Sequence, residues 1–402
     1  MTWIKVLIFA LPWVAWPGRE DAFLGPKQAI LLIGCWGLLL TTWLSAYPTP
    51  IVPWRNVWAR RFALYVLLFG AFRFWLPFLD RVPNAGFVYN IHIWEATLYV
   101  LTGILTVHCL VTYWLTSSAR ATQITQWVCQ SSVAIAIYVL FQRLGIEQFY
   151  AVPVGESDQR WFAGMGNVGI VATYLAMTVP LFLLFTKRRY LVFLGLVLGA
   201  IWVSDARYAW GAAGAGLLTY GSLRLSERLS RRWRPTLVLG LIVLFGLGAR
   251  YAWQPLTTDQ RWPIWTEAFR LWKDENPDQS RFSWTGRGLE TFPMIFMEPA
   301  HKSLKPDIQE IIKGSGWRTA HNDLLQALFE LGLLGTGLLV LMVGSSLRAA
   351  WDSRQTILGT GWLSAGVSLL FLSATYFPWH VAPTTFLGLL IWAMCERQEA
   401  TA

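Results

Sequence analysis

The sequence predicts an all-α polytopic membrane protein with about twelve transmembrane helices and one large folded, helical outer loop. Composition is the first reason. The 402 residues are 55% hydrophobic and only 14% charged, with a mean hydropathy of +0.42, whereas soluble domains carry about 25% charged residues. The 25 Trp and 13 Tyr fit many membrane–water crossings, because amphipathic rings settle at headgroup level. A large soluble enzyme is therefore disfavoured.

Apolar segments recur along the chain at a spacing that fits membrane helices. A helical span needs about 20 apolar residues, and several of these segments are shorter than that. The predicted spans are 3–16, 27–47, 62–79, 93–117, 124–141, 168–186, 190–204, 208–222, 236–250, 322–346, 356–376 and 379–395. The first span lacks a small-residue cleavage site, so we interpret it as a retained helix and not a signal peptide. The chain then divides into membrane helices one to nine (1–250), an outer loop (251–320) and helices ten to twelve (321–402).

Positive charge in the short loops predicts the orientation of these helices. Lys and Arg are enriched in cytoplasmic loops, and here they fall in every second short loop when the N-terminus is placed inside. The basic residues concerned are Arg55, Arg60, Arg61, Arg120, Lys187, Arg188, Arg189, Arg224, Arg228, Arg231, Arg232, Arg234, Arg348 and Arg354. We therefore read the net charge of +10 as a topology signal first and as phosphate binding second, with no nucleic-acid partner. Residues 251–320 then lie outside, which is the periplasm in a cell with two membranes.

The outer loop carries its own helical patterns. Aromatic residues in 259–273 stand at helical spacing and predict one aromatic face, made by Trp262, Trp265, Phe269 and Trp272. Asp259 is a suitable N-cap for that helix. A second short helix is predicted from Asp307 to Lys313, started by Pro306. We expect a folded lid lying on the membrane, since the loop is short for a soluble catalytic domain.

Neither a metal nor a cofactor is predicted. The four cysteines, Cys35, Cys109, Cys129 and Cys395, fall in or beside apolar segments without CxxC spacing, which indicates packing thiols in place of a zinc site or disulfides. The outer loop also lacks an Asp-x-Asp pattern for magnesium. We therefore expect chemistry that needs no metal.

Four arginines are predicted on the outer side: Arg207, Arg261, Arg287 and Arg318. The planar guanidinium group stays charged and matches phosphate oxygens with two parallel hydrogen bonds, so a pyrophosphate at a membrane surface is the ligand that suits them. Each has a simpler interpretation. Arg207 could extend from a helix end toward water, Arg261 could anchor a helix at the interface, and Gly286-Arg287-Gly288 could be a tight turn. Arg318 is interpreted as a lid residue.

His321 stands where the polar loop re-enters a hydrophobic helix. A histidine has an ordinary pKa near neutrality, so it can give or take a proton at such a surface. An isolated histidine at a helix start is also frequently a cap or an interface residue. Asn322 would cap the helix or fix the tautomer of the histidine.

The run from His321 resembles the signature of the O-antigen ligase family, which reads His-Asn, nine residues, Gly, two residues, Gly. That family is the lipopolysaccharide branch of a superfamily that also holds O-antigen polymerases and protein O-oligosaccharyltransferases. Four earlier elements resemble the family in the same order. They are Gly166-Asn167, followed by Val168-Gly169 where the family has Pro-Asn; the Arg207 turn, with Tyr208 where the family has glycine; Arg261-Trp262-Pro263-Ile264-Trp265; and Gly286-Arg287-Gly288 with Phe292. Together the five elements span about residues 164–335.

The resemblance implies an inverting, metal-independent glycosyltransferase of a bacterial inner membrane, with its active site facing the periplasm. The donor would be a glycan on undecaprenyl pyrophosphate and the acceptor a sugar hydroxyl of lipid A-core. Fixed guanidinium groups would stabilise the leaving pyrophosphate, and a histidine would serve as general base. The catalytic set is Arg207, Arg261, Arg287 and His321, and the substrate-binding set adds Arg318, Asn322, Gly286 and Gly288.

Two other functions stay open. An O-antigen or exopolysaccharide polymerase would use a second lipid-linked glycan as acceptor; one dominant outer loop and the complete His-Asn motif favour the ligase. A lipid-linked glycan flippase would carry ionisable residues in mid-span and show repeat symmetry. Here the charged residues gather at span ends, apart from a few such as Arg73 and Glu95. A protein oligosaccharyltransferase usually has a longer C-terminal part.

Overall fold

The computed structural model describes residues 1–14, 24–46, 56–80, 85–146, 163–228, 261–273, 282–297, 304–313 and 317–397. Within these ranges every regular element is helical and no strand occurs, so the all-α prediction is confirmed for the described part of the chain. The predicted span 236–250 and the predicted cap Asp259 lie outside these ranges.

The described helices follow one another along the chain in this order. The N-terminal half contains α1 (Thr2–Ala10), α2 (Leu24–Ala46), α3 (Val57–Asp80), α4 (Ala85–Cys109) with η1 (Leu110–Trp114), α5 (Ser118–Arg143), α6 (Val168–Thr178) with η2 (Val179–Leu184), α7 (Arg188–Val203) and α8 (Arg207–Arg228). The C-terminal half contains α10 (Arg261–Lys273), α11 (Phe282–Thr285), α12 (Thr291–Phe296), α13 (Pro306–Lys313), α14 (Asp323–Asp352), α15 (Ile357–Thr375), η3 (Pro378–His380) and α16 (Ala382–Glu396).

Each predicted span inside the described ranges contains a helix, but only some are long enough to cross a bilayer. Five helices are both long and apolar enough: Gly25–Ser45, His92–Trp114, Ser118–Arg143, Asp323–Asp352 and Ile357–Thr375. Val168–Leu184 and Ala382–Glu396 are shorter apolar helices. These segments are those of a multi-pass membrane protein, whereas the count of twelve spans stays a prediction.

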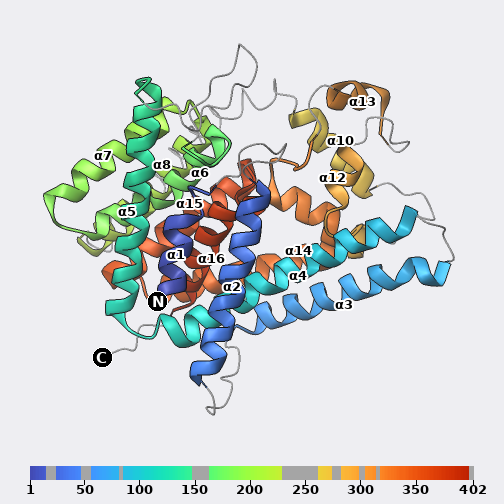
Figure 1. The fold of residues 1–402 in the computed structure, drawn as a ribbon, viewed down its shortest axis with the longest axis horizontal. Helices are drawn as coiled ribbons and strands as arrows, with labels where there is room; N and C mark the ends of the chain where they lie inside the picture. The colour runs from blue at the N-terminus through green and yellow to red at the C-terminus, as the bar shows by residue number, and fades with distance from the viewer. Residues whose placement is uncertain are drawn as a thin grey trace.

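Helices α8 and α15 pack side by side (Figure 1), because small residues line their contact. A methyl group at Gly211 would overlap the Phe371 ring, and one at Gly216 would overlap Ser368 Oγ. Ser368 Oγ donates a hydrogen bond of 2.9 Å to the Ala212 carbonyl. Small residues of this kind let membrane helices approach backbone to backbone. The pairing brings the first residues of α8 beside the last residues of α15.

The segment around α10, α12 and α13 has a hydrophobic core of its own. These helices gather above α3, α4 and α14 at the upper right of Figure 1. Their buried apolar residues include Ile264, Leu271, Phe292, Phe296, Ile308, Ile312 and Trp317, packed against Phe329 of α14. This part of the outer loop is therefore folded, as expected. Whether it lies in the periplasm stays a prediction.

The two predicted helices of this segment form, with one refinement. Helix α13 begins at Pro306 as predicted. In α10, however, the buried residues are Ile264, Glu267, Ala268 and Leu271, while Trp262 and Phe269 are exposed. The four aromatic residues therefore do not share one environment: Trp262 and Phe269 point outward, whereas Trp265 and Trp272 are half-buried at the edge of the core that the aliphatic side of the helix fills.

Helix α14 is broken at Gly332, where φ is 66° and ψ is −171°. The break frees carbonyl groups that a continuous helix would use internally. The backbone N–H of Arg287 donates to the Phe329 carbonyl (3.1 Å) and that of Gly288 to the Glu330 carbonyl (2.8 Å). Tyr65 Oη donates to the Leu331 carbonyl (2.7 Å). The glycine-rich loop at 286–288 is thus docked on the break in α14.

We predict that Gly332→Ala destabilises the protein severely. Only glycine adopts this backbone conformation readily, at a cost of about 1–3 kcal/mol for other residues, and the added methyl would also overlap the Gly286 nitrogen. Thermal unfolding in detergent, followed by size-exclusion recovery, measures the loss. Gly337→Ala is the matched control, since it lies on the same helix with no atom within 4 Å of an added methyl. Equal unfolding temperatures for the two variants would contradict the account of the break.

Candidate active site

His321 lies directly before the N-cap of α14. Asn322 Oδ1 accepts a hydrogen bond of 3.0 Å from the Leu325 N–H. Of the two roles considered for Asn322, the cap is the one that the structure shows. His321 itself has a φ of 52°, in the left-handed region that costs a residue with a side chain about 1–2 kcal/mol. Contacts with the surrounding residues therefore hold the His321 backbone in an unfavourable conformation.

Left-handed backbone in residues other than glycine is confined to four positions of the described chain: Ala163, Asp205, Glu290 and His321. Each lies in or beside one of the loop elements that resemble the family. Asp205 precedes Arg207 in its turn, and Glu290 follows Gly288. Strained backbone of this kind gathers at functional sites, where surrounding contacts hold it. The pattern supports treating the four loops as parts of one site.

The His321 ring is enclosed by aromatic edges. Its centroid lies 4.7 Å from that of Phe377, 5.1 Å from Trp317 and 5.7 Å from Tyr376, all at steep interplanar angles. Its Nδ1 atom is buried and has no hydrogen-bond partner among the described residues. Packing alone therefore orients the ring.

The environment lowers the pKa of His321 to about 3. Burial is the largest cause, followed by the positive charges of Arg261 and His380. The sequence led us to expect a value near neutrality, so the structure corrects that expectation. A buried imidazole surrounded by apolar rings and facing two cations cannot easily gain a third positive charge. His321 is therefore neutral at physiological pH and keeps a lone pair that can accept a proton.

Two stacked tyrosines border the histidine. The rings of Tyr208 and Tyr376 have centroids 4.4 Å apart and lie 14° from parallel. Their hydroxyl groups converge on Gly169, whose N–H donates to Asn167 Oδ1 (2.7 Å). Through these contacts the Gly-Asn element, the Arg207 turn and the histidine motif meet at one place.

The predicted arginines differ in where the structure places them. Arg261, the first residue of α10, has its guanidinium carbon 6.0 Å from the centre of the Tyr208 ring, and its charge acts on His321 and Tyr376 as well. Arg207 begins α8 and is exposed, directly before Tyr208. Arg318 is also exposed, three residues before His321. The structure thus brings Arg261 to the histidine and places Arg207 beside the tyrosine pair.

Arg287 makes contacts of a different kind. Its Nη2 donates to the Leu271 carbonyl of α10 (2.7 Å), and its guanidinium carbon lies 5.4 Å from the centre of the Phe329 ring in α14. Gly286 and Gly288 lie against the break in α14. In this structure Arg287 joins α10 to α14, and no described contact joins it to His321.

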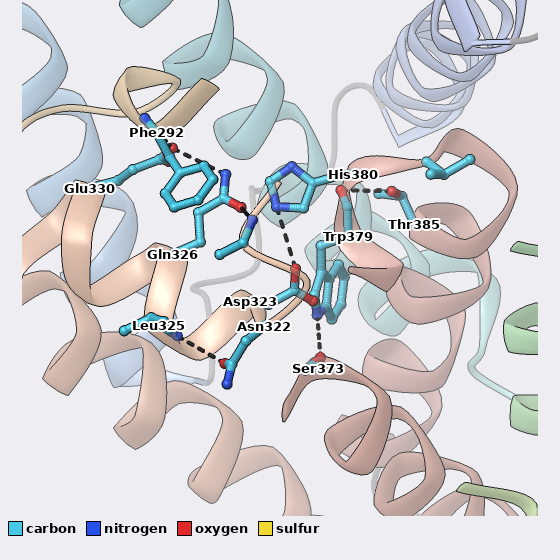
Figure 2. A network of polar contacts seen from close by, with 12 residues as sticks. Phe292, Asn322, Asp323, Leu325, Gln326, Glu330, Ser373, Trp379, His380 and Thr385 are labelled. Atoms are coloured by element: carbon cyan, nitrogen blue, oxygen red, sulfur yellow. Dashed lines mark hydrogen bonds and ion pairs between the residues drawn. The ribbon is translucent and has the colours of Figure 1, made fainter. Parts of the chain in front are cut away.

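An ion pair that the sequence analysis missed holds the start of α14. His380 Nε2 lies 3.3 Å from Asp323 Oδ1, and their side chains are 27% and 10% exposed. Figure 2 shows His380 reaching Asp323 from the segment between α15 and α16, beside Trp379, whose Nε1 donates to Ser373 Oγ (3.0 Å). Asp323 directly follows the His-Asn motif, and this was the one available signal. The partner stands 57 residues further along (323 to 380), so sequence alone could not pair them.

The loop before His321 is held from both sides. The Ala320 N–H donates to Gln326 Oε1 (3.1 Å), and the Ala320 carbonyl accepts from the Trp265 indole of α10. Gln326 in turn donates to Glu330 (3.1 Å), which accepts from the Phe292 N–H (3.3 Å; Figure 2). These contacts connect the outer-loop helices to the residue next to His321.

One segment of the chain, which includes most of the residues described above, matches a known protein family. The O-antigen ligase family model matches residues 191–340. Over that segment the chain is similar to the O-antigen ligase family. This confirms the resemblance seen in the sequence motifs, and the matched residues include Arg207, Arg261, Arg287 and His321, whereas Asn167 and Gly169 precede them. No curated protein matches the chain.

We predict that His380→Ala lowers the stability of the protein. It leaves the buried Asp323 carboxyl group without its ion-pair partner, which typically costs about 1–3 kcal/mol. Thermal unfolding in detergent measures the change. His92→Ala is the control, because His92 pairs with Glu95 at 3.4 Å through side chains that are 52% and 66% exposed, and such pairs contribute about 0–1 kcal/mol. If the two variants unfold alike, the Asp323–His380 pair does not fix α14.

Proposed function

We propose that this protein is an integral-membrane inverting glycosyltransferase that moves a glycan from undecaprenyl pyrophosphate to a sugar hydroxyl of lipid A-core. The O-antigen ligase match indicates an enzyme of the ligase or polymerase type acting on lipid-linked glycans. One observation carries the finer proposal: a neutral, enclosed His321 stands in the same cluster as Arg261. A general base and a fixed cation are the two groups that glycosyl transfer from a pyrophosphate requires.

In the proposed reaction the acceptor hydroxyl oxygen attacks the anomeric carbon as the bond from that carbon to the pyrophosphate oxygen breaks. The hydroxyl proton passes to the lone pair of His321, which becomes more basic when the negative pyrophosphate of the donor offsets the neighbouring Arg261 charge. Undecaprenyl pyrophosphate leaves with the bonding electrons. Negative charge grows on the leaving oxygen, where the fixed guanidinium groups of Arg261 and Arg207 stabilise it. Arg287 would hold α10, and hence Arg261, in place. We propose that no divalent metal takes part; loss of turnover in excess EDTA that Mg²⁺ restores would contradict this.

Contacts at the other end of the bundle support an outward-facing site. There Asn56 and Ser346 meet Glu396, and Arg397 donates to the Leu115 carbonyl (2.9 Å). The basic residues Arg120 and Arg348 lie at this end, almost the whole length of α14 from His321. Because basic loops mark the cytoplasm, we propose that His321 faces the periplasm of a bacterial inner membrane.

Cysteine labelling tests this orientation. All four native cysteines are buried, so Arg318→Cys and Arg120→Cys can be compared with little background. A membrane-impermeant thiol reagent should reach position 318 and not 120 in intact spheroplasts. The opposite pattern would invert the topology.

The acceptor distinguishes the alternatives. A ligase transfers the glycan to lipid A-core, whereas a polymerase extends a second lipid-linked glycan. Purified protein offered both acceptors with one labelled donor gives the answer directly. Movement of the donor across vesicles without any transfer would instead indicate a flippase.

We predict that substitutions of the arginines and of His321 affect donor binding and transfer differently. Arg261→Ala and Arg207→Ala should weaken donor binding and transfer together, and Arg→Lys should restore only part, because an ammonium cannot reproduce the bidentate fork. His321→Ala should keep donor affinity and reduce transfer by about 10²-fold or more, the usual scale for a lost general base. Donor binding and transfer rate are measured on the same purified variants.

Arg348→Ala is the matched control for these substitutions. Arg348 is exposed on α14 and pairs loosely with Asp352 (3.6 Å) at the end far from His321, so both quantities should stay at wild-type values. Near-normal transfer by His321→Ala would remove the general base from the proposal and leave the arginines as its only catalytic groups.

We predict that lowering the pH causes no loss of glycan transfer with a midpoint near pH 6.5. The pKa of His321 is lowered to about 3, so between pH 8 and pH 5 the imidazole stays neutral and able to accept a proton. Arg261→Ala removes a neighbouring positive charge and should raise that pKa, which moves the acid limb toward neutral pH. The measurement is the pH profile of kcat/KM for the acceptor. His380 is the other histidine near the site, and His380→Gln tests whether its titration causes any loss of transfer at low pH. If the wild-type enzyme loses activity with a midpoint near pH 6.5, and His380→Gln shows the same loss, a buried and neutral His321 is contradicted.

A further inference from the structure

Gly169 is a position where this chain has no room for a side chain. A methyl group there would overlap the Tyr208 hydroxyl oxygen and lie 2.6 Å from that of Tyr376. Real carbon atoms do not approach oxygen so closely, so the two hydroxyl groups and a side chain at 169 exclude one another. Gly169 also lies in the first turn of α6, held by Asn167 Oδ1. The space beside this turn is thus filled from two other helices.

The two tyrosines reach this space from different parts of the chain. Tyr208 is the second residue of α8 and follows Arg207 directly. Tyr376 directly follows α15 and is 4% exposed. Their rings are stacked, and both hydroxyl oxygens lie against the backbone of Gly169. The two oxygens therefore share one small space beside α6, so the pair is placed more specifically than apolar packing alone would require.

The pair lies between the charged turn and the histidine. On one side Tyr208 continues from Arg207 and lies near the Arg261 guanidinium. On the other side the Tyr376 ring meets the edge of His321 at 5.7 Å and stacks on Phe377 at 4.0 Å. Because His321 Nδ1 has no described hydrogen-bond partner, these ring contacts fix its direction.

We propose that Tyr208 and Tyr376 are positioning residues, whose paired hydroxyl groups, seated against the bare Gly169, hold His321 in register with Arg207 and Arg261. The inference rests on the proposed function, in which His321 accepts the acceptor proton. A side chain is absent at position 169, and the Tyr208 side chain fills the same space.

Single and paired substitutions test the hydroxyl groups. Tyr208→Phe and Tyr376→Phe keep the rings and remove the oxygens. Each should lower kcat for transfer about 10-fold or more, because a small misplacement of a catalytic group is costly, while the donor Kd and the acceptor KM stay near wild type. The double variant should be no worse than either single variant, since both oxygens occupy one space against Gly169 and act as a unit.

Gly169→Ala provides the second arm. In the wild-type background it should reduce kcat about 10-fold or more, whereas in the Tyr208→Phe/Tyr376→Phe background, which lacks both oxygens, the added methyl should cost at most about 2-fold. The controls are Tyr190→Phe, a buried tyrosine stacked on Phe185 (4.3 Å), and Gly214→Ala, where nothing lies within 4 Å of the methyl. Both should retain wild-type transfer. Thermal unfolding is recorded for every variant.

The outcomes separate this inference from the proposed function. If wild-type protein transfers glycan but the tyrosine variants keep wild-type kcat, or their losses add, or the losses follow unfolding temperature, the positioning role is wrong. If wild-type protein transfers no glycan from undecaprenyl pyrophosphate to either acceptor, the proposed function itself fails.

Discussion

The hydrogen bonds from the 286–288 loop to the broken helix α14 are the contact on which the site depends. In a membrane every backbone polar group needs a partner, and broken helices persist only where protein supplies one. The N–H groups of Arg287 and Gly288 supply it to the carbonyl groups of Phe329 and Glu330. Gly332 makes the break possible, and Gly286 makes room for it, since a methyl on either glycine would overlap the other's backbone. The Gly286-Arg287-Gly288 loop and the break in α14 at Gly332 are separated in sequence and form one contact.

This contact between the 286–288 loop and α14 connects the outer-loop helices to His321. The short first part of α14, from Asp323 to Leu331, is fixed at its far end by the loop and at its near end by His380. Gln326 and Trp265 then hold Ala320, the residue before the histidine. His321 thus has a strained backbone, a ring oriented by aromatic edges and neighbours that are hydrogen-bonded on both sides. Such overdetermined packing is what lets a left-handed histidine persist.

How far the sequence predicts this arrangement differs from residue to residue. Helix α10 follows from periodicity, because its aromatic residues stand at helical spacing, and α13 follows from Pro306 at its start. The short helices α11 and α12 carry no such signal. The position of Asn322 as a cap follows from its place before an apolar run. The Asp323–His380 pair does not follow, since nothing local tells which of several polar residues will meet across a helix packing. The outward direction of Trp262 and Phe269 was likewise hidden, because periodicity shows a face but not which face is buried.

The low pKa of His321 could not be read from the sequence either. A histidine beside a polar loop suggests a solvated group with an ordinary value. In the structure three aromatic side chains and two cationic neighbours surround it. They come from three segments: the loop before His321, the start of α10, and the stretch between α15 and α16. Burial, the largest contribution, depends on how Trp317, Tyr376 and Phe377 close around the ring. Only the fold brings them together.

The arginines also show that one residue type at regular motif positions need not do one task. Arg261 acts through its charge on the groups around His321. Arg287 instead donates a guanidinium hydrogen bond to the Leu271 carbonyl, near the end of the helix that Arg261 begins. A guanidinium suits both tasks because it stays charged and offers donors in fixed directions. Since α10 is a short rigid helix, releasing Leu271 at one end would let Arg261 move at the other. Loss of Arg287 would then reduce transfer even without any contact to the pyrophosphate, so its effect on turnover alone does not identify it as a substrate ligand.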